Sequence, residues 1–152
     1  MSKMRTIIRS VRRALRHLGG CAMSERPRVL IVEDQYLEAL DARDELTRAG
    51  FTCVGIANTA AEAALLAARE RPHLILMDIR LASRTDGVEI AREIYEQHGI
   101  RCVFVTAQTD PAVRKNAQRA QPLGWLEKPY SPAALIEVVE SAMAQIANVG
   151  SA

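Results

Sequence analysis

The sequence is poor in the residues that build disulfide frameworks, zinc sites and membrane spans. Its three cysteines, Cys21, Cys53 and Cys102, are widely spaced with no CxxC pair, and its three histidines lie far apart. Structural zinc sites gather four such ligands at short spacings, so we expect no zinc site. No apolar stretch approaches the roughly 18 residues that a transmembrane helix needs. These absences favour a cytoplasmic protein with reduced thiols, of which Cys53 and Cys102 are expected in the core.

The composition fits one small domain with an uneven charge distribution. The chain has 152 residues, of which 49% are hydrophobic, which is enough for a compact core. Residues 1–28 hold eight basic side chains against Glu25 alone, whereas the remainder holds 12 basic and 17 acidic ones. Because nucleic-acid binding needs a basic surface, this acidic remainder is not expected to bind DNA or RNA.

The basic N-terminal segment, residues 1–24, stands apart from the rest of the chain. Its apolar side chains recur at helical spacing with basic ones on the other faces: Met4, Ile7, Ile8, Val11, Ala14, Leu15 and Leu18 against Lys3, Arg5, Arg9, Arg12, Arg13 and Arg16. An amphipathic helix of this kind suits an anionic membrane surface or a partner's groove, with residues 1–22 in contact. Other interpretations stay open: the natural start is Met23, the segment is a flexible extension with no role, or it is a targeting peptide.

From Arg28 onward, apolar runs alternate with helical patterns. The expected strands are 28–32, 51–56, 73–78, 101–105 and 123–126, and the expected helices are 35–48, 60–70, 87–98, 110–119 and 132–147. Strands joined by helices pair in parallel through right-handed crossovers. The sequence therefore predicts an α/β fold with a doubly wound, five-stranded parallel sheet.

Three of the expected helices carry end signals. Thr59 and Glu62 form a capping box at the start of the second helix. Ser131 is an expected N-cap, with Pro132 at the first helical position of the last helix. Gly50 is expected to stop the first helix.

Polar residues follow the ends of four of the expected strands. They are Glu33 and Asp34 after the first, Asp78 at the end of the third, Thr106 after the fourth and Lys128 after the fifth. Because the carboxyl ends of parallel strands line one crevice, these side chains should converge. Three acids, a hydroxyl and a lysine suit a Mg²⁺ ion and a phosphoryl group.

These motifs give the chain a resemblance to a known family. Residues 27–147 resemble the receiver domains of bacterial two-component response regulators, through Val29–Asp34, Leu76–Leu81, Asp86-Gly87, Val105–Ala107 and Lys128-Pro129, in this order. The resemblance implies a (βα)5 flavodoxin-like sheet with strand order 2-1-3-4-5. Because only a short tail, residues 148–152, follows, we expect a stand-alone receiver without an output domain.

The resemblance also implies a set of metal-binding residues. Asp34 and Asp78 would bind Mg²⁺ (or Mn²⁺) directly, Glu33 through a water molecule, and Arg80 through its backbone carbonyl. The cation would cancel the repulsion between the attacking carboxylate and the phosphoryl group. Asp34 has a competing interpretation as the N-cap of the first helix, which is compatible with metal binding.

The same resemblance assigns the transfer to Asp78, the nucleophile that becomes an aspartyl phosphate. Lys128 would pair first with Asp78 and then with a phosphoryl oxygen, and the bond before Pro129 is usually cis in this family. Thr106 would donate its hydroxyl to another phosphoryl oxygen, and the small Ala107 would leave room for the group. Without the resemblance, Thr106 is an ordinary β-branched strand residue and Lys128 a solvated surface cation.

Two features depart from the commonest receivers. The loop from Ile79 to Asp86 is one residue longer than usual, and Arg80 within it lies beside the site. Trp125, three residues before Lys128, occupies the position of the family's switching aromatic. An inward turn of this ring on phosphorylation would change the face formed by the fourth helix, fifth strand and fifth helix. The alternative is that the bulky indole stays outward as a partner contact.

We therefore expect a response regulator that accepts a phosphoryl group from a histidine kinase or phosphotransfer protein and signals through protein contacts, with homodimer formation left open. It would not be an enzyme, although it would assist its own phosphorylation and dephosphorylation. The alternatives are a phosphate sink and a phosphorylation-independent adaptor. An aspartate-nucleophile phosphatase would need an acid where Arg80 stands, and a flavin module would need a Ser/Thr/Gly-rich loop after the first strand.

Overall fold

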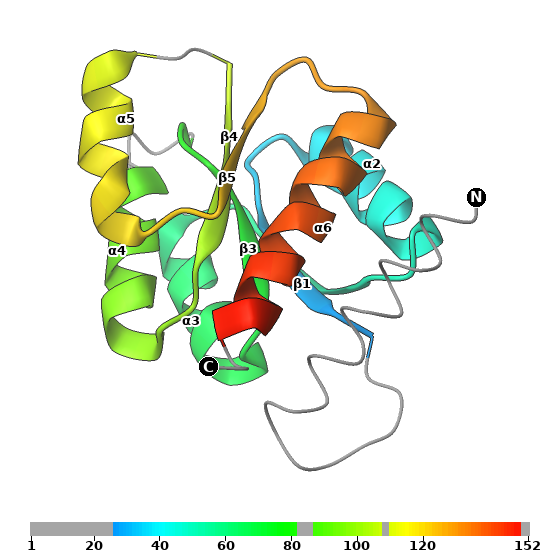
Figure 1. Ribbon diagram of the computed structural model, residues 1–152, viewed down its shortest axis with the longest axis horizontal. Coiled ribbons are helices and arrows are strands. Elements are labelled where there is room, and N and C mark those ends of the chain that lie inside the picture. Colours follow the sequence, from blue (N-terminus) through cyan, green and yellow to red (C-terminus); the bar gives the residue numbers. More distant parts are fainter. Residues whose placement is uncertain (1–25, 82–86, 108–109, 150–152) are drawn as a thin grey trace.

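The computed structural model describes residues 26–81, 87–107 and 110–149. In chain order the elements are β1 (Arg28–Val32), α2 (Tyr36–Arg48), β2 (Thr52–Ala57), α3 (Ala60–Glu70), β3 (Leu74–Asp78), α4 (Gly87–His98), β4 (Cys102–Thr106), α5 (Pro111–Ala117), the 3₁₀ turn η1 (Gln118–Ala120), β5 (Gly124–Glu127) and α6 (Pro132–Val149) (Figure 1). The strands form one parallel sheet in the order β2-β1-β3-β4-β5. The predicted doubly wound, flavodoxin-like α/β fold and its strand order are confirmed.

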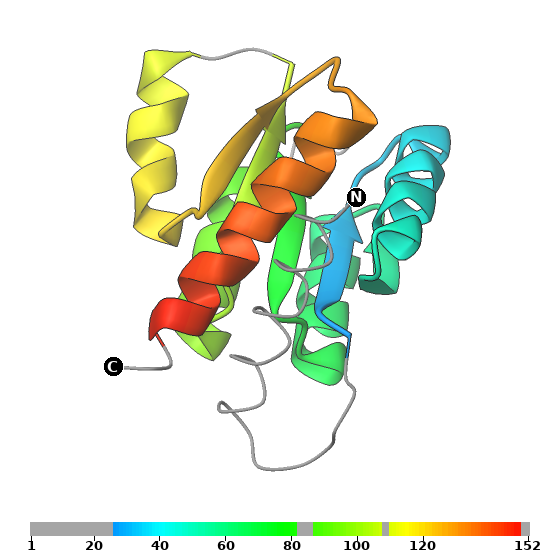
Figure 2. The same ribbon diagram turned by 45° about the vertical axis from the view of Figure 1, so that its right-hand side comes forward.

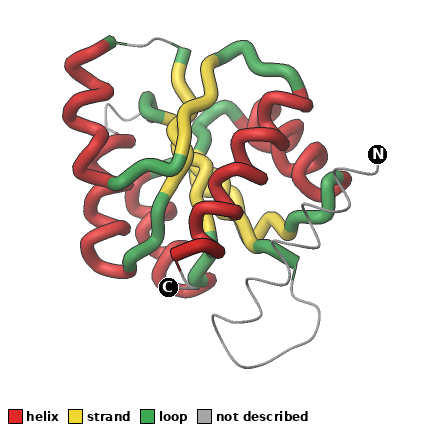
Figure 3. The backbone as a smooth tube through the Cα atoms, viewed as in Figure 1, coloured by secondary structure: helices red, strands yellow, loops and turns green. Residues whose placement is uncertain are grey.

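Helices cover both faces of the sheet, α2 and α6 on one and α3, α4 and α5 on the other, as Figures 1 and 2 show and Figure 3 repeats with the strands in yellow. Successive strand residues point to opposite faces, so two apolar clusters form. Val29 and Ile31 of β1 join the cluster under α2 and α6, whereas Leu30 and Val32 join the other. Strands that are buried on both faces have continuous apolar sequences, which explains the apolar runs that predicted these strands.

The pairing register brings the strand ends together at one edge of the sheet. Val32 lies opposite Met77, so the residues that follow β1 emerge beside the end of β3. The backbone N–H of Lys128 donates to the carbonyl oxygen of Thr106 (2.7 Å), which ties the turn after β5 to the end of β4. The predicted convergence of strand-end residues therefore follows from backbone pairing.

Two of the predicted helix caps are present. The Thr59 hydroxyl accepts a hydrogen bond from the N–H of Glu62 (3.2 Å), while the Glu62 carboxylate reaches back to the N–H of Asn58 (2.9 Å). The Ser131 hydroxyl accepts from the N–H of Ala134 (3.1 Å). Each bond satisfies an N–H group that the first helical turn leaves without a partner.

Some predicted boundaries need correction. Gln35, and not Asp34, is the N-cap of α2, so the alternative capping role of Asp34 is wrong. Asp110 caps α5 instead of lying within it, because its side chain accepts the N–H of Ala112 (2.9 Å). The helix ends at residue 117 and tightens into the turn η1, while α6 continues two residues beyond the predicted 147.

Two of the segments singled out in the sequence cannot be compared with the structure. The basic segment 1–24 and the loop residues 82–86 lie outside the described residues. Within the described residues, no helix combines the length and apolarity that crossing a bilayer requires.

Cys102 is in the core as expected, but Cys53 is only half-buried. Burial raises the pKa of both thiols, which favours their unreactive protonated form.

Gly87 opens α4 where the chain returns against the end of β3. Its N–H donates to the carbonyl oxygen of Ile79 (2.9 Å), and an added methyl group would collide with the carbonyl oxygen of Asp78. We predict that Gly87→Ala lowers the free energy of unfolding by about 2 kcal/mol, because backbone atoms must move to admit the methyl group. Urea unfolding followed by circular dichroism measures the change. In the control Gly55→Ala the new methyl group meets only side-chain atoms, those of Leu66 at 3.2 Å and Leu30 at 3.6 Å, so the loss should be smaller. Equal losses would contradict the prediction.

Candidate functional site

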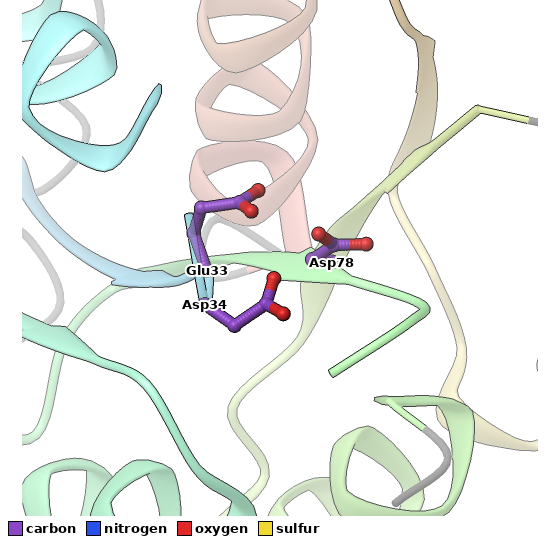
Figure 4. A group of neighbouring side chains, drawn as sticks. All are labelled: Glu33, Asp34 and Asp78. Atoms are coloured by element: carbon purple, nitrogen blue, oxygen red, sulfur yellow. The ribbon is translucent and has the colours of Figure 1, made fainter. Parts of the chain in front are cut away.

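Three carboxylates gather at the carboxyl ends of β1 and β3. Glu33 and Asp34 follow β1, Asp78 is the last residue of β3, and one oxygen from each lies within 4.8 Å of the others (Figure 4). Glu33 is 6% exposed and Asp78 is 7% exposed, whereas Asp34 is half-buried. Buried carboxylates are costly unless they are paired, so their partners decide what the site can do.

Two of these carboxylates are oriented by the turns that follow them. Glu33 Oε1 accepts the N–H of Gln35 (3.1 Å), and Asp78 Oδ1 accepts the N–H of Arg80 (3.0 Å). Such bonds from a side chain to the backbone two residues on shape the start of a loop. Each acid is thereby held by one oxygen, and its second oxygen faces the ammonium group of Lys128.

Lys128 joins the strand ends through its ammonium group. The Nζ atom lies 2.8 Å from Glu33 Oε2 and 3.2 Å from Asp78 Oδ2, and it also lies 2.7 Å from Oε2 of Glu38 in the first turn of α2. An ammonium has three donors, so three carboxylates saturate it. The expected cis bond between Lys128 and Pro129 is present. The structure thus brings the predicted pair of Asp78 and Lys128 into contact.

Burial and charge shift the pKa values of this cluster. Burial raises the pKa of Glu33 from 4.5 to about 7, with a contribution from the charge of Asp78, although the hydrogen bond from Lys128 opposes the rise. Burial lowers the pKa of Lys128, but its hydrogen bonds to Glu33 and Glu38 outweigh that effect and raise it overall. Lys128 is therefore a permanent cation at neutral pH.

The cluster has the chemistry of a divalent cation site. When Glu33, Asp34 and Asp78 are ionised, the single positive charge of Lys128 leaves an excess of two negative charges. Mg²⁺ prefers hard oxygen ligands and keeps several waters, so a few carboxylates that share one space are sufficient to hold it. The donor set therefore fits the predicted Mg²⁺, with these three acids as the side chains that would hold it.

The predicted residues Arg80, Thr106 and Ala107 line a cavity together with acids of the cluster and the lysine. This cavity measures about 470 Å³, and its wall includes Asp78, Arg80, Thr106, Ala107 and Lys128. The Thr106 side chain is buried at the end of β4, whereas Ala107 and Arg80 are exposed. An open cavity between the acid, the hydroxyl and the ammonium has room for a small anion.

Trp125 lies apart from this cavity. It is half-buried in β5, with its ring centroid 5.1 Å from that of the buried Phe104 and the guanidinium carbon of Arg114 4.7 Å from its ring centre. Trp125 is not one of the described residues that line the cavity. Two residues of β5, Leu126 and Glu127, separate it from Lys128 along the chain.

Glu38 is the site residue that the sequence interpretation missed. It belongs to α2, while the prediction considered only residues at strand ends. No local pattern pairs it with Lys128, which lies 90 positions away in the sequence. The contacts of Trp125 with Phe104 and Arg114 were also missed, because nothing in the sequence pairs those residues.

The raised pKa of Glu33 predicts a pH-dependent stability. A folded-state pKa above the unfolded value means that Glu33 stabilises the fold fully below about pH 4.5 and that this contribution is lost as pH rises through about 7. We expect Glu33→Gln, without metal, to gain stability relative to the unaltered chain between pH 5 and pH 8, by about 1 kcal/mol after allowance for water at the site. Chemical unfolding at several pH values, with a chelator present, tests this. The exposed Glu93→Gln serves as the control; parallel pH profiles for the two variants would contradict the prediction.

Comparisons with known proteins agree with this geometry. Residues 29–140 match the response regulator receiver domain. The transcriptional regulatory protein PdtaR of Mycobacterium tuberculosis is 33% identical over 80% of this chain, which spans 59% of PdtaR. The polar-differentiation response regulator DivK of Brucella anthropi is 33% identical over 74% of this chain and 93% of its own length. The signal receiver domain of a modulated diguanylate cyclase from Desulfovibrio desulfuricans G20 is 33% identical with a TM-score of 0.74, over 80% of this chain and 97% of that one. The chain belongs to the response regulator receiver domain family of two-component signalling.

Proposed function

We propose that the protein accepts a phosphoryl group on Asp78 from the phosphohistidine of a sensor kinase or phosphotransfer protein, and that the modification switches its protein contacts. One observation carries the proposal. The ends of β1, β3 and β5 place Glu33, Asp78 and Lys128 in mutual contact beside an open cavity. A buried acid paired with a permanent cation, at an edge that accommodates Mg²⁺, suits phosphoryl transfer.

The transfer is a displacement at phosphorus. A carboxylate oxygen of Asp78 attacks the phosphorus atom, the P–N bond to the donor imidazole breaks, and that imidazole takes up a proton. Asp34 and Asp78 would hold Mg²⁺ directly, Glu33 would hold it through a water and Arg80 through its backbone carbonyl, and the bound cation would neutralise charge on the transferring oxygens. The buried position of Asp78 limits the approach of bulk water to the acyl phosphate that forms.

Three residues stabilise the phosphorylated form. Lys128 exchanges its contact with Asp78 for one with a phosphoryl oxygen, which keeps its charge paired. The Thr106 hydroxyl donates to another oxygen from the end of the neighbouring strand, and the small Ala107 leaves space at the mouth of the cavity. All three line the same cavity as Asp78, which supports these roles.

The output surface is the face formed by α5, β5 and α6. Trp125 lies in β5 under Arg114 of α5, and movement of Thr106 toward the phosphoryl group would change the space available to the indole. This surface would bind a downstream protein, and the kinase or phosphotransfer protein would engage the cavity at Asp78. Profiling phosphotransfer from the sensor kinases of the source organism identifies the donor.

The modification itself is directly testable. Incubation with acetyl phosphate and Mg²⁺ should add one phosphoryl group to the chain, as intact-protein mass spectrometry would show. Asp78→Asn should abolish the adduct because the nucleophile is gone, and Asp34→Ala or a chelator should nearly abolish it. Asp41→Asn, on the same helix as Glu38 but outside the cavity at Asp78, should react like the unaltered chain. Equal labelling of the Asp78→Asn protein would refute the assignment.

The role of Trp125 predicts a fluorescence response. It is the one tryptophan of the chain, so its emission is unambiguous. Beryllofluoride, a mimic of the acyl phosphate, should change the emission beyond any effect of Mg²⁺ alone, because the indole moves relative to Phe104 and Arg114. Thr106→Ala should keep the Mg²⁺ response and lose most of the beryllofluoride response. An unchanged spectrum in a protein that accepts phosphate would make Trp125 a static contact residue.

A further inference from the structure

The shortest ion pair of Lys128 is with Glu38 and not with the proposed nucleophile. The Nζ atom lies 2.7 Å from Glu38 Oε2 and 3.2 Å from Asp78 Oδ2. The Glu38 side chain is 51% exposed, whereas that of Asp78 is 10% exposed. Glu38 is also not one of the three acids whose oxygens share the candidate metal site. Its contact with Lys128 is therefore separate from the candidate metal site.

We propose that Glu38 is a positioning residue that holds the Lys128 ammonium in the unphosphorylated protein and competes with the phosphoryl group for it. This inference rests on the proposed function, because it assigns a regulator of the phosphoryl transfer to Asp78. Glu38 sets how readily the phosphorylated state forms and how long it lasts.

Lys128 has a limited number of hydrogen-bond donors. Its three N–H groups face three carboxylates. Asp78 gives up one of them when its oxygen joins the acyl phosphate, and a second N–H group reaches the phosphoryl oxygens only if Glu33 or Glu38 releases it. Glu33 cannot easily release the ammonium group, because its side chain is only 8% exposed and its other oxygen accepts a hydrogen bond from the N–H of Gln35. Glu38 is half in solvent, so water replaces the ammonium at small cost when the pair opens.

Linkage gives the direction of the effect. A contact that Lys128 makes only in the unphosphorylated state stabilises that state, and it weakens the phosphorylated state by the same factor. Removal of the Glu38 carboxylate should therefore favour the anion-bound form. An exposed ion pair of this kind corresponds to an effect of roughly threefold to fivefold in affinity.

The test is a titration of the full chain with beryllofluoride at saturating Mg²⁺, followed by ¹⁹F NMR. Glu38→Gln should bind beryllofluoride roughly threefold or more tightly than the unaltered chain, and its aspartyl phosphate, made with acetyl phosphate, should decay more slowly. Asp41→Asn is the matched control. It removes one negative charge one turn further along α2, and among the described residues Asp41 forms no ion pair with Lys128. Equal tightening in the two variants would overturn the proposal.

A double-mutant cycle shows whether Glu38 acts through Lys128. In a Lys128→Ala background, Glu38→Gln should leave beryllofluoride affinity unchanged, because the ammonium is gone. The same tightening in both backgrounds would make Glu38 a simple repulsive charge and overturn the proposal. If the unaltered chain takes up neither beryllofluoride nor phosphate on Asp78, the proposed function fails and this inference fails with it. If it does so and Glu38→Gln has the same affinity, only this inference fails.

Discussion

The arrangement of the site depends on one ammonium group. Lys128 lies between carboxylates from the turn after β1, from the end of β3 and from the first turn of α2. Buried carboxylates in close proximity repel one another and are poorly solvated, so they are stable in ionised form only with a nearby cation. The raised pKa of Glu33 shows that even this pairing does not fully compensate for burial. The site therefore holds an excess of negative charge that a divalent cation would relieve.

The sheet holds these charged side chains close together despite their repulsion. Its three central strands are almost completely buried, and their apolar side chains fill a core on each face. Because backbone pairing fixes the positions of the strand ends, the acids cannot move apart to relieve their repulsion. The side chains of Glu33 and Asp78 also shape the turns that follow them. Apolar burial stabilises the fold and thereby holds a site that is unfavourable by itself.

The site and the proposed output surface are connected through β5. Lys128 follows this strand, and Trp125 within it packs against Phe104 and Arg114 on the side of α5. A change in the partner of Lys128 acts at the end of the strand that carries the indole, and a change at Thr106 acts at the end of the neighbouring strand β4, whose Phe104 contacts the indole. The acids and the lysine were expected from the sequence, whereas the contacts of Glu38 and Arg114 come from the tertiary structure. Differences between receivers with the same acids can arise from such neighbouring residues.

The strand order was implied only by the family resemblance. The sequence by itself determined the doubly wound parallel sheet, the element boundaries within a few residues and the convergence of Glu33, Asp34, Asp78 and Lys128. These features depend on apolar periodicity, local caps and the geometry of parallel strands, all of which are visible in short segments. Only the tertiary structure decided that Glu38 contacts Lys128, a residue 90 positions away, and that Arg114 covers Trp125. Both contacts depend on how each helix is rotated against the sheet. Packing of the whole core sets that rotation, and no short segment of sequence specifies it.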